Sequence, residues 1–296
     1  MNRELARSIL KKCRIEKGSG FSLSEHSTHG GEIGVSKADA PALLRQGIET
    51  LAALQDRLAA QDRHAVLVIF QAMDAAGKDG AIKHAFSGLN PQGTSVYSFK
   101  APTSEDLDRD FLRRHIIRLP TRGQIGIHNR SWYEEVLIAR VHKSILARQN
   151  LPQEVVGPEI WRERLEDIAA FERYLGRQGF MVLKFFLHVS KEEQRERLLA
   201  RIDEPDKNWK MDPSDIAERA HWDDYQEAYQ EAVRATATSA APWFVIPADR
   251  KWLTRLLVVE AMIEALEKID PRYPEVDDAE REALRQAGQA LRRKGA

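Results

Sequence analysis

The segment that most constrains the fold is an eight-residue run, AVLVIFQA at 65–72, followed at once by a loop of small residues. A short run rich in β-branched residues is typical of a strand buried on both faces, as in a parallel sheet. The loop continues as MDAAGKDG and leads into a predicted helix over 81–88. A strand, a small-residue loop with Gly-Lys and a helix, in this order, predict a phosphate-binding loop.

The residue types of this loop suit phosphate. Small side chains let backbone N–H groups surround phosphate oxygens, and a helix N-terminus adds partial positive charge. We expect Lys78 to carry a full positive charge to the phosphate being transferred. The alternative is a tight glycine-rich turn with a solvated lysine. The other residues expected to bind phosphate here are Ala75, Ala76, Gly77, Asp79 and Gly80.

The loop departs from the common phosphate-loop pattern. Ala72 stands in place of the leading glycine, and Asp79 in place of the serine or threonine that ordinarily holds magnesium. Asp74 adds a carboxylate inside the loop, where it would repel phosphate. An acid at this position makes sense if it holds magnesium or orients a phosphate acceptor, so we predict one of these roles for Asp74.

The rest of the chain alternates between strand and helix patterns, which predicts an α/β protein with a central parallel sheet of about five strands flanked by helices. The four further strands are expected at 95–99, 124–129, 180–189 and 242–247. The helices are expected from residue 39 onward, at 104–114, 132–142, 158–177 and 191–202, from about 213, and at 252–269.

Three regions are expected along the chain. Residues 1–38 contain a short basic helix and a Gly/Ser/His-rich stretch, which predict a flexible N-terminal arm on the surface with no core of its own. Residues 39–273 form the main domain. Residues 274–296 form one further polar helix, expected to be peripheral.

A second cluster of polar residues follows the strand expected at 124–129. Asn129 and Arg130 come directly after its apolar residues, and the carboxyl ends of strands in an open α/β sheet face the ligand crevice. Arg130 is therefore a candidate for stabilising charge on a transferring phosphoryl group. The alternative is an arginine that caps a helix or pairs with Glu134.

A basic, tryptophan-containing stretch follows the strand at 180–189. The helix that follows carries Arg195, Arg197 and Arg201. The turn DEPDKNWK then places Lys207, Trp209 and Lys210 close together. In small-molecule kinases a mobile helical segment late in the fold brings cations over the phosphates. A solvated helix face with ion pairs between successive turns is the alternative for the helix.

Composition limits the classes of partner. The 296 residues include 45 basic and 45 acidic side chains, so the surface cannot be basic all over, as a coat for nucleic acid or an anionic membrane would be. A local basic cleft remains possible. The single cysteine, Cys13, the charged N-terminal residues and apolar runs shorter than the ~20 residues of a membrane helix favour a cytoplasmic protein.

With these clusters the sequence resembles the polyphosphate kinase 2 family from about residue 65 to about residue 273. FQAMDAAGKDGAIKH resembles its Walker A segment, and LNPQGTSVYSFKAPT its following strand. GQIGIHNRSWYEEVL is similar to its Walker B segment, and KFFLHVSKEEQRERLLARIDEPDKNWKMDPSD with HWDDYQEAY to its lid module. The motifs occur in the family's order, which makes the match specific.

The resemblance implies a fold similar to thymidylate kinase, with a helical lid at about 201–220 and a phosphotransferase domain at 39–273. It implies reversible, magnesium-dependent transfer between inorganic polyphosphate and AMP or ADP, by in-line attack. Asp74 would hold magnesium or activate the acceptor, Lys78 would bind the transferred phosphate and Arg130 would stabilise its charge. Family members carry Asp or Asn at the position of Asn129.

The resemblance also implies partners and a channel. The partners would be polyphosphate and a purine nucleotide (AMP, ADP, ATP or GDP), with neither nucleic acid nor membrane, in a homo-oligomer (dimer or tetramer). The residues expected to contact the nucleotide are Asn129, Tyr133, Glu134, Glu135 and Trp209. The basic residues expected along a polyphosphate channel are Lys83, Arg113, Arg114, Arg118, Arg122, Arg201, Lys207 and Lys210.

Two other functions remain open from the sequence. One is a conventional nucleoside monophosphate kinase that uses ATP as donor, and the other is a P-loop protein that binds nucleotide as a switch without turnover. The two acidic departures in the loop, Asp74 and Asp79, speak against both.

Overall fold

The computed structural model describes residues 3–31 and 36–294. Within these residues six strands form one sheet in the order β1-β6-β5-β2-β4-β3, with β2 to β6 parallel and β1 antiparallel to β6. The α/β prediction is confirmed, although the sheet is mixed rather than purely parallel. The strands span Arg14–Ile15 (β1), Ala65–Ala72 (β2), Thr94–Ser98 (β3), Ile125–Asn129 (β4), Phe180–His188 (β5) and Trp243–Pro247 (β6).

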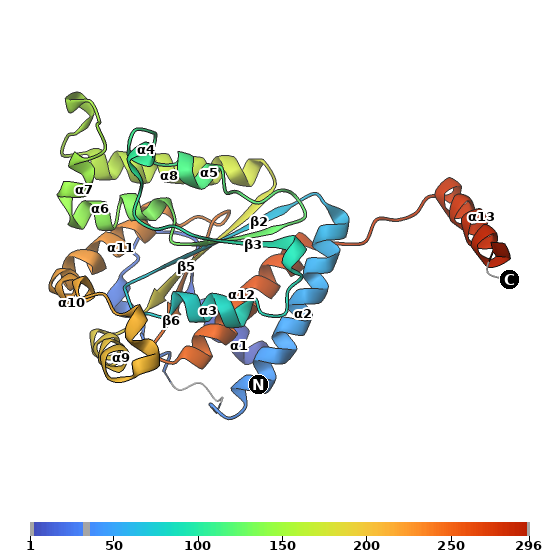
Figure 1. Ribbon diagram of the computed structural model, residues 1–296, viewed down its shortest axis with the longest axis horizontal. Coiled ribbons are helices and arrows are strands. Elements are labelled where there is room, and N and C mark those ends of the chain that lie inside the picture. The colour runs from blue at the N-terminus through green and yellow to red at the C-terminus, as the bar shows by residue number, and fades with distance from the viewer. Residues whose placement is uncertain (1–2, 32–35, 295–296) are drawn as a thin grey trace.

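Helices cover both faces of this sheet, so the domain has three layers (Figure 1). Helices α2, α3 and α12 pack together on one face, while α8 and α11 pack together on the other. The longer helices are α1 (Arg3–Cys13), α2 (Ala40–Gln61), α3 (Lys78–Ala85), α8 (Ile160–Arg177), α9 (Lys191–Asp203), α11 (Trp222–Thr236), α12 (Lys251–Ile269) and α13 (Asp278–Lys294).

Strand β2 lies in the middle of the sheet, between β4 and β5, and all eight of its residues are buried. Its position explains the apolar run, because a central strand packs against helices on both faces. Asn129, the last residue of β4, pairs with Phe70, and Leu187 of β5 pairs with Ala72. The parallel registers therefore bring the carboxyl ends of three strands to one edge.

Two predicted helices are broken into shorter turns. The segment predicted as one helix over 104–114 forms α4 (Ser104–Leu107) and α5 (Arg113–Ile116). Between them the Asp110 side chain accepts a hydrogen bond from the backbone N–H of Leu112, an arrangement that competes with continued helix. The segment 132–142 likewise forms η3 (Trp132–Glu135) and α6 (Ile138–Val141). Helix α4 begins with a capping box formed by Thr103 and Asp106.

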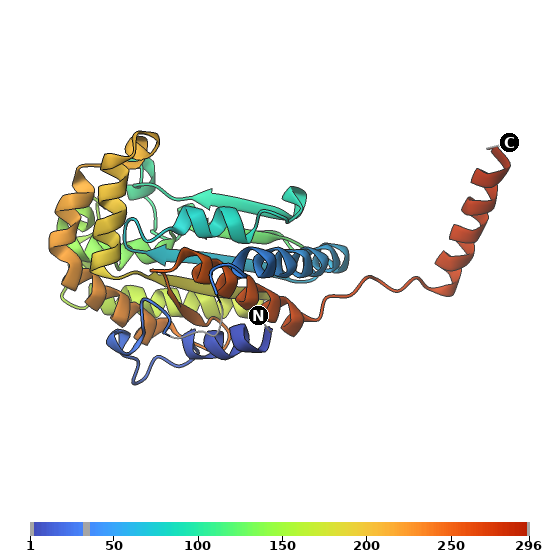
Figure 2. The same ribbon diagram turned by 90° about the horizontal axis from the view of Figure 1, so that it is seen from below.

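The N-terminal region differs from the expected surface arm. Helix α1 packs on α12, as Figure 2 also shows, and Leu10 is 0% exposed. Phe21 and Leu23 after it are buried in the main core as well, and β1 adds the sixth strand. These side chains are apolar and find a partner surface that the local sequence does not reveal. Residues 1–2 and 32–35 of the predicted arm lie outside the described residues.

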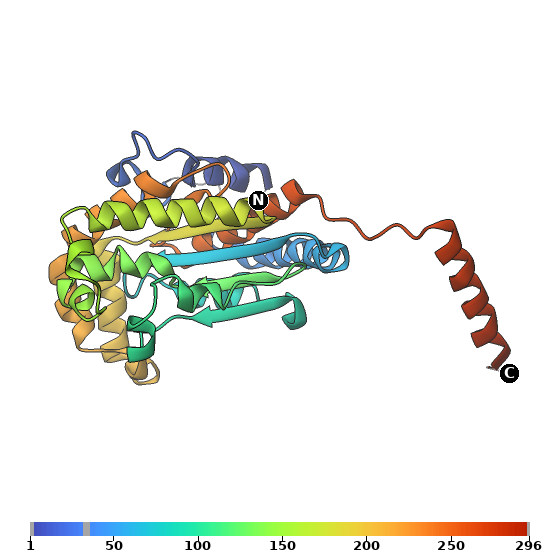
Figure 3. The same cartoon turned by 90° about the horizontal axis from the view of Figure 1, so that it is seen from above.

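The C-terminal helix α13 stands apart from the domain in all three views (Figures 1 to 3). Residues 272–277, which connect it to the domain, are all exposed, and Leu284 and Leu291 on the helix are exposed. No helix among the described residues is long and apolar enough to cross a membrane.

The burial of α1 makes a prediction about stability. Replacing Leu10 by alanine removes a fully buried side chain and should lower the free energy of unfolding by about 3 kcal/mol. Leu284→Ala on exposed α13 is the matched control and should change it by less than about 0.5 kcal/mol. Denaturant or thermal unfolding measures both. Equal midpoints for Leu10→Ala and the native chain would mean that α1 is not part of the cooperative core.

Candidate active site

The predicted phosphate loop connects β2 to α3 at the carboxyl edge of the sheet. Two of its residues have left-handed backbone, Ala75 (φ 59°) and Gly77 (φ 104°), which turns the chain sharply before the helix. Glycine adopts this conformation without a Cβ penalty, so the Gly of Gly-Lys fits its place. Helix α3 begins at Lys78, three residues earlier than expected, because Gly77 serves as its N-cap.

Lys78 is folded back over the loop. Its side chain is 9% exposed, and Nζ donates to the carbonyl oxygen of Ala72 at 2.8 Å. Burial, and next the positive charge of Arg130, lower the pKa of Lys78. A cation held this way stands inside the loop and gains from an incoming anion, which would replace part of the lost hydration.

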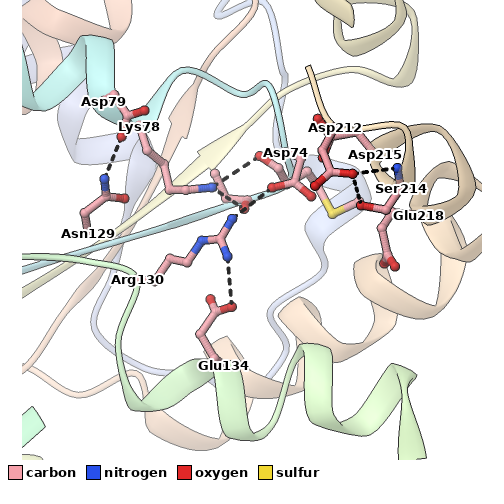
Figure 4. Close-up of polar contacts among 12 residues, drawn as sticks. Asp74, Lys78, Asp79, Asn129, Arg130, Glu134, Asp212, Ser214, Asp215 and Glu218 are labelled. Atoms are coloured by element: carbon pink, nitrogen blue, oxygen red, sulfur yellow. Dashed lines mark hydrogen bonds and ion pairs between the residues drawn. The ribbon is translucent and has the colours of Figure 1, made fainter. Parts of the chain in front are cut away.

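Arg130 follows β4 and reaches the loop from the neighbouring strand. Its Nη2 lies 3.1 Å from Oδ1 of Asp74, and its Nη1 lies 4.0 Å from Glu134 (Figure 4). The pKa of Arg130 is raised, chiefly by the charge of Glu134. The ion pair joins Asp74, which follows β2, to Arg130, which follows β4. Asp74, Lys78 and Arg130 are thus brought together as predicted from sequence.

Asp79 and Asn129 form a second link between these strand ends. The Asn129 Nδ2 donates to Oδ1 of Asp79 at 2.6 Å. Asp79 stands where serine or threonine is usual, and its carboxylate is thus paired with the amide of β4. Asn129 is therefore positioned by the loop.

Helix α9 holds the loop backbone from the opposite side. Arg197 donates to the carbonyl oxygens of Ala76 at 2.7 Å and Ala75 at 3.2 Å. Gln194, one turn earlier, donates to the carbonyl oxygen of Asp74 at 3.0 Å. The sequence placed Arg197 on a basic helix, but the helix face that would meet the loop could not be deduced from local pattern.

The loop opens into a cavity of about 820 Å³ whose far wall is the segment predicted as a lid. This wall comprises η5 (Pro205–Lys210) and α10 (Ser214–Glu218). Arg201 of α9 pairs with Asp215 at 3.0 Å, and Lys207 pairs with Glu204. Burial, and next the charge of Asp74, raise the pKa of Asp215. The cations that sequence analysis missed in this cavity are Lys100, Lys251 and Arg255.

Most of the predicted site residues do meet at this cavity. Those that line it are Asp74, Ala75, Ala76, Gly77, Lys78, Asp79, Gly80, Asn129, Arg130, Arg201, Lys207 and Lys210. Glu134 faces a small neighbouring pocket that Asp74 and Arg130 also line.

Several predicted residues lie elsewhere. Arg122 precedes β4 at the amino edge of the sheet and donates to the carbonyl oxygen of Gln178, so the topology keeps it from the cavity. Tyr133 and Glu135 belong to the turn that follows Arg130, and both are buried, which excludes direct contact with a nucleotide in this conformation. Lys83 is exposed on α3, and Trp209, 79% exposed, projects from η5.

The side chains around the loop can be compared with the ligands that a divalent cation needs. Among residues 3–31 and 36–294 no group of three or more His, Cys, Asp or Glu side chains could hold a metal by itself. Mg²⁺ does not need one, because it usually keeps several waters and binds through one or two carboxylates plus substrate phosphates. Asp74, which lies in the loop and is partly exposed, fits that kind of ligand set.

The central strand, its phosphate loop and the cations around Asp74 define a P-loop protein built for phosphate chemistry. The chain belongs to the polyphosphate kinase 2 family, whose model, described as "Polyphosphate kinase 2", matches residues 34–274. The fold is therefore of the P-loop kinase kind, in agreement with the resemblance seen in the sequence.

Individual relatives are similar over almost the whole chain. The "ADP-polyphosphate phosphotransferase" of Rhodopseudomonas palustris is 47% identical, over 95% of this chain and 98% of its own. The "AMP/ADP-polyphosphate phosphotransferase" of Meiothermus ruber is 42% identical, over 91% and 97%. The crystal structure of polyphosphate kinase 2 from Arthrobacter aurescens aligns with a TM-score of 0.82 at 40% identity, covering 91% and 94%.

Lys78 gives the sharpest test of the site. Lys78→Ala removes the only positively charged side chain between Gly77 and Gly80, where the loop would meet the incoming phosphate, and should lower kcat by about 10²-fold or more. Lys143→Ala, at an exposed position on α7 (Lys143–Ala147), is the matched control and should retain native turnover. Steady-state kinetics with polyphosphate and ADP measure both. Native turnover in Lys78→Ala would mean that the loop is not the catalytic phosphate site.

Proposed function

We propose that this protein transfers phosphoryl groups reversibly between inorganic polyphosphate and a nucleoside mono- or diphosphate. The observation that carries the proposal is a large cavity in which Lys78 and Arg130 surround Asp74, with further cations on the lid side. The relatives named above act, by their names, between polyphosphate and ADP or AMP, and another is named "GDP-polyphosphate phosphotransferase".

Polyphosphate would enter along the basic wall of the cavity. Arg201, Lys207 and Lys210 come from the lid segment, and Lys251 and Arg255 from α12. These cations lie on three separate elements, α9, η5 and α12, so an extended polyanion could contact several at once, whereas a single triphosphate needs fewer. Positive groups spread along a cavity wall neutralise successive phosphates of such a chain.

The nucleotide would bind beside Asp74, with its base toward the pocket of Glu134. That pocket is lined by Glu134, Glu218, Tyr225 and Tyr229 as well as Arg130. Carboxylates accept hydrogen bonds from amino groups of a purine, and aromatic side chains provide apolar contact. This assigns the nucleotide to the Arg130 side of the cavity and polyphosphate to the lid side.

In the proposed reaction an oxygen of the acceptor's terminal phosphate attacks the terminal phosphorus of polyphosphate in line. A new P–O bond forms as the bond to the shortened polymer breaks, and no covalent intermediate with the enzyme is required. Lys78 and Arg130 neutralise charge on the transferring group, and Asp74 orients the acceptor. We assign Asp74 as the ligand of Mg²⁺, which when bound would neutralise phosphate charge.

Other properties of the proposal come from the resemblance and the sequence. Residues 201–220 would act as a lid over the phosphates, and the working form would be a homo-oligomer, dimer or tetramer. A reducing cytoplasmic setting suits Cys13, the single cysteine, which is buried and has no second cysteine for a disulfide.

An acceptor panel tests the function. With polyphosphate and Mg²⁺ we expect AMP to yield ADP, and ADP to yield ATP, as separated by ion-exchange chromatography. GDP and pyrimidine nucleotides in the same panel report the base preference. A protein that forms no product with polyphosphate, yet phosphorylates a monophosphate with ATP, would be a conventional monophosphate kinase. Nucleotide binding without product from either donor would indicate a switch.

The proposed polyphosphate wall makes a separate prediction. Replacing both Lys207 and Lys210 by alanine should raise the KM for polyphosphate severalfold, more at low salt, because two cations that line the cavity are lost. Arg122→Ala is the matched control, since Arg122 lies at the opposite edge of the sheet. A KM for polyphosphate that rises in Arg122→Ala but not in the double variant would reverse the assignment.

A further inference from the structure

The turn that carries Arg130 is anchored in the protein interior by aromatic side chains. Trp132 and Tyr133 of η3 are both 0% exposed. The Nε1–H of Trp132 donates to Oε1 of Glu172 at 3.3 Å, and the hydroxyl of Tyr133 donates to the same oxygen at 2.8 Å. Two consecutive residues of one turn therefore converge on a single carboxylate of α8.

Glu172 is itself held by a buried lysine. Lys184 of β5 donates to Oε2 of Glu172, to the carbonyl oxygen of Thr236 at 2.8 Å and to the hydroxyl of Tyr133 at 3.2 Å. The Thr236 hydroxyl also lies 2.7 Å from the Tyr133 hydroxyl. Lys184 and Glu172 are 0% and 2% exposed, so the network is closed to solvent.

Burying this ion pair costs free energy, because both charges are removed from water. Burial raises the pKa of Glu172 and lowers that of Lys184, because each loses hydration of its charged form. Apolar residues of similar volume often serve stability as well or better, so such a pair is weak support for a purely stabilising role. The position of the pair, directly beneath the turn, suggests a different use.

The turn holds the backbone of Arg130 in a strained conformation. Its φ of 68° lies in the left-handed region, which a non-glycine residue holds only when its surroundings fix it. On the strand side its N–H donates to the carbonyl oxygen of Phe70 at 3.0 Å. On the helix side Ser131 is buried, and Trp132 and Tyr133 are tied to Glu172. The strained residue is thus fixed from both ends.

We propose that Glu172 is a positioning residue, which acts through Tyr133 and Trp132 to hold Arg130 at the phosphoryl group, while Lys184 balances its buried charge. This inference rests on the proposed role of Arg130. A small displacement of a group that stabilises transferring charge costs much of its effect, so the pair serves the rate rather than the affinity for substrate. It also gives Tyr133 a role in place of the expected nucleotide contact.

Tyr133→Phe in two backgrounds tests the connection to Arg130. The change removes one hydroxyl and leaves Glu172 and Lys184 together. In the native background kcat should fall about tenfold, the scale of one lost hydrogen bond, with the KM for each substrate within about twofold. In an Arg130→Ala background the same change should lower kcat less than twofold, because the group being positioned is gone.

The outcomes separate this inference from the proposed function. If Arg130→Ala itself turns over like the native protein, the role of Arg130 is wrong. If Arg130→Ala is impaired and Tyr133→Phe lowers kcat by the same factor in both backgrounds, or in neither, positioning through Arg130 is wrong.

A paired substitution keeps the inference testable if single changes disturb folding. Glu172→Gln with Lys184→Met removes both charges but keeps an oxygen that accepts from Tyr133 and Trp132, and should keep kcat within about threefold. Glu172→Leu with Lys184→Met removes that acceptor and should lower kcat about tenfold. Ile168→Val, buried on the same helix, is the control for a general loss of packing and should keep native kcat. Equal kcat in the Gln and Leu pairs would overturn the inference.

Discussion

The structure of the site depends on one unfavourable feature, a carboxylate inside a phosphate-binding loop. Asp74 would repel the phosphates that the loop is built to hold, unless positive charge stands close to it. Arg130 supplies that charge at 3.1 Å, from the end of the neighbouring strand, and Lys78 lies beside it. The adjacency of β2 and β4 in the sheet meets this need, because neighbouring strand ends bring Asp74 and Arg130 together.

Local sequence predicted the structure correctly where the residues of one segment determine its conformation by themselves. The bounds of β2 were predicted to the residue, because eight buried positions and the loop after them form one continuous pattern. Local sequence did not predict the burial of residues whose partners lie far away in the chain. Leu10 is buried against α12, more than two hundred residues away, although Ala6, Leu10 and Cys13 already have the spacing of a helix face. Tyr133 is buried because Glu172 lies beneath it.

The positions of the charged side chains likewise could not be predicted from composition. Equal numbers of acidic and basic residues say nothing about where either kind lies. Arg122 was grouped with the other basic residues, yet it precedes a strand, and residues before parallel strands lie at the edge opposite the phosphate loop. Lys251 and Arg255 were overlooked because α12 is largely apolar, although its first turns border the cavity.

The two residues that looked like separate departures from the phosphate-loop pattern form one interaction. Asp79 replaces a hydroxyl residue, and Asn129 stands where an aspartate is common; the amide of Asn129 donates to the carboxylate of Asp79 at 2.6 Å. An aspartate at position 129 would place two carboxylates at hydrogen-bond distance, where one would have to take up a proton. An amide at position 129 avoids this. It joins the end of β4 to the first turn of α3 without adding a charge. The asparagine is thus explained by its partner across the strands, and it leaves Asp74 as the acid of the loop that faces Arg130.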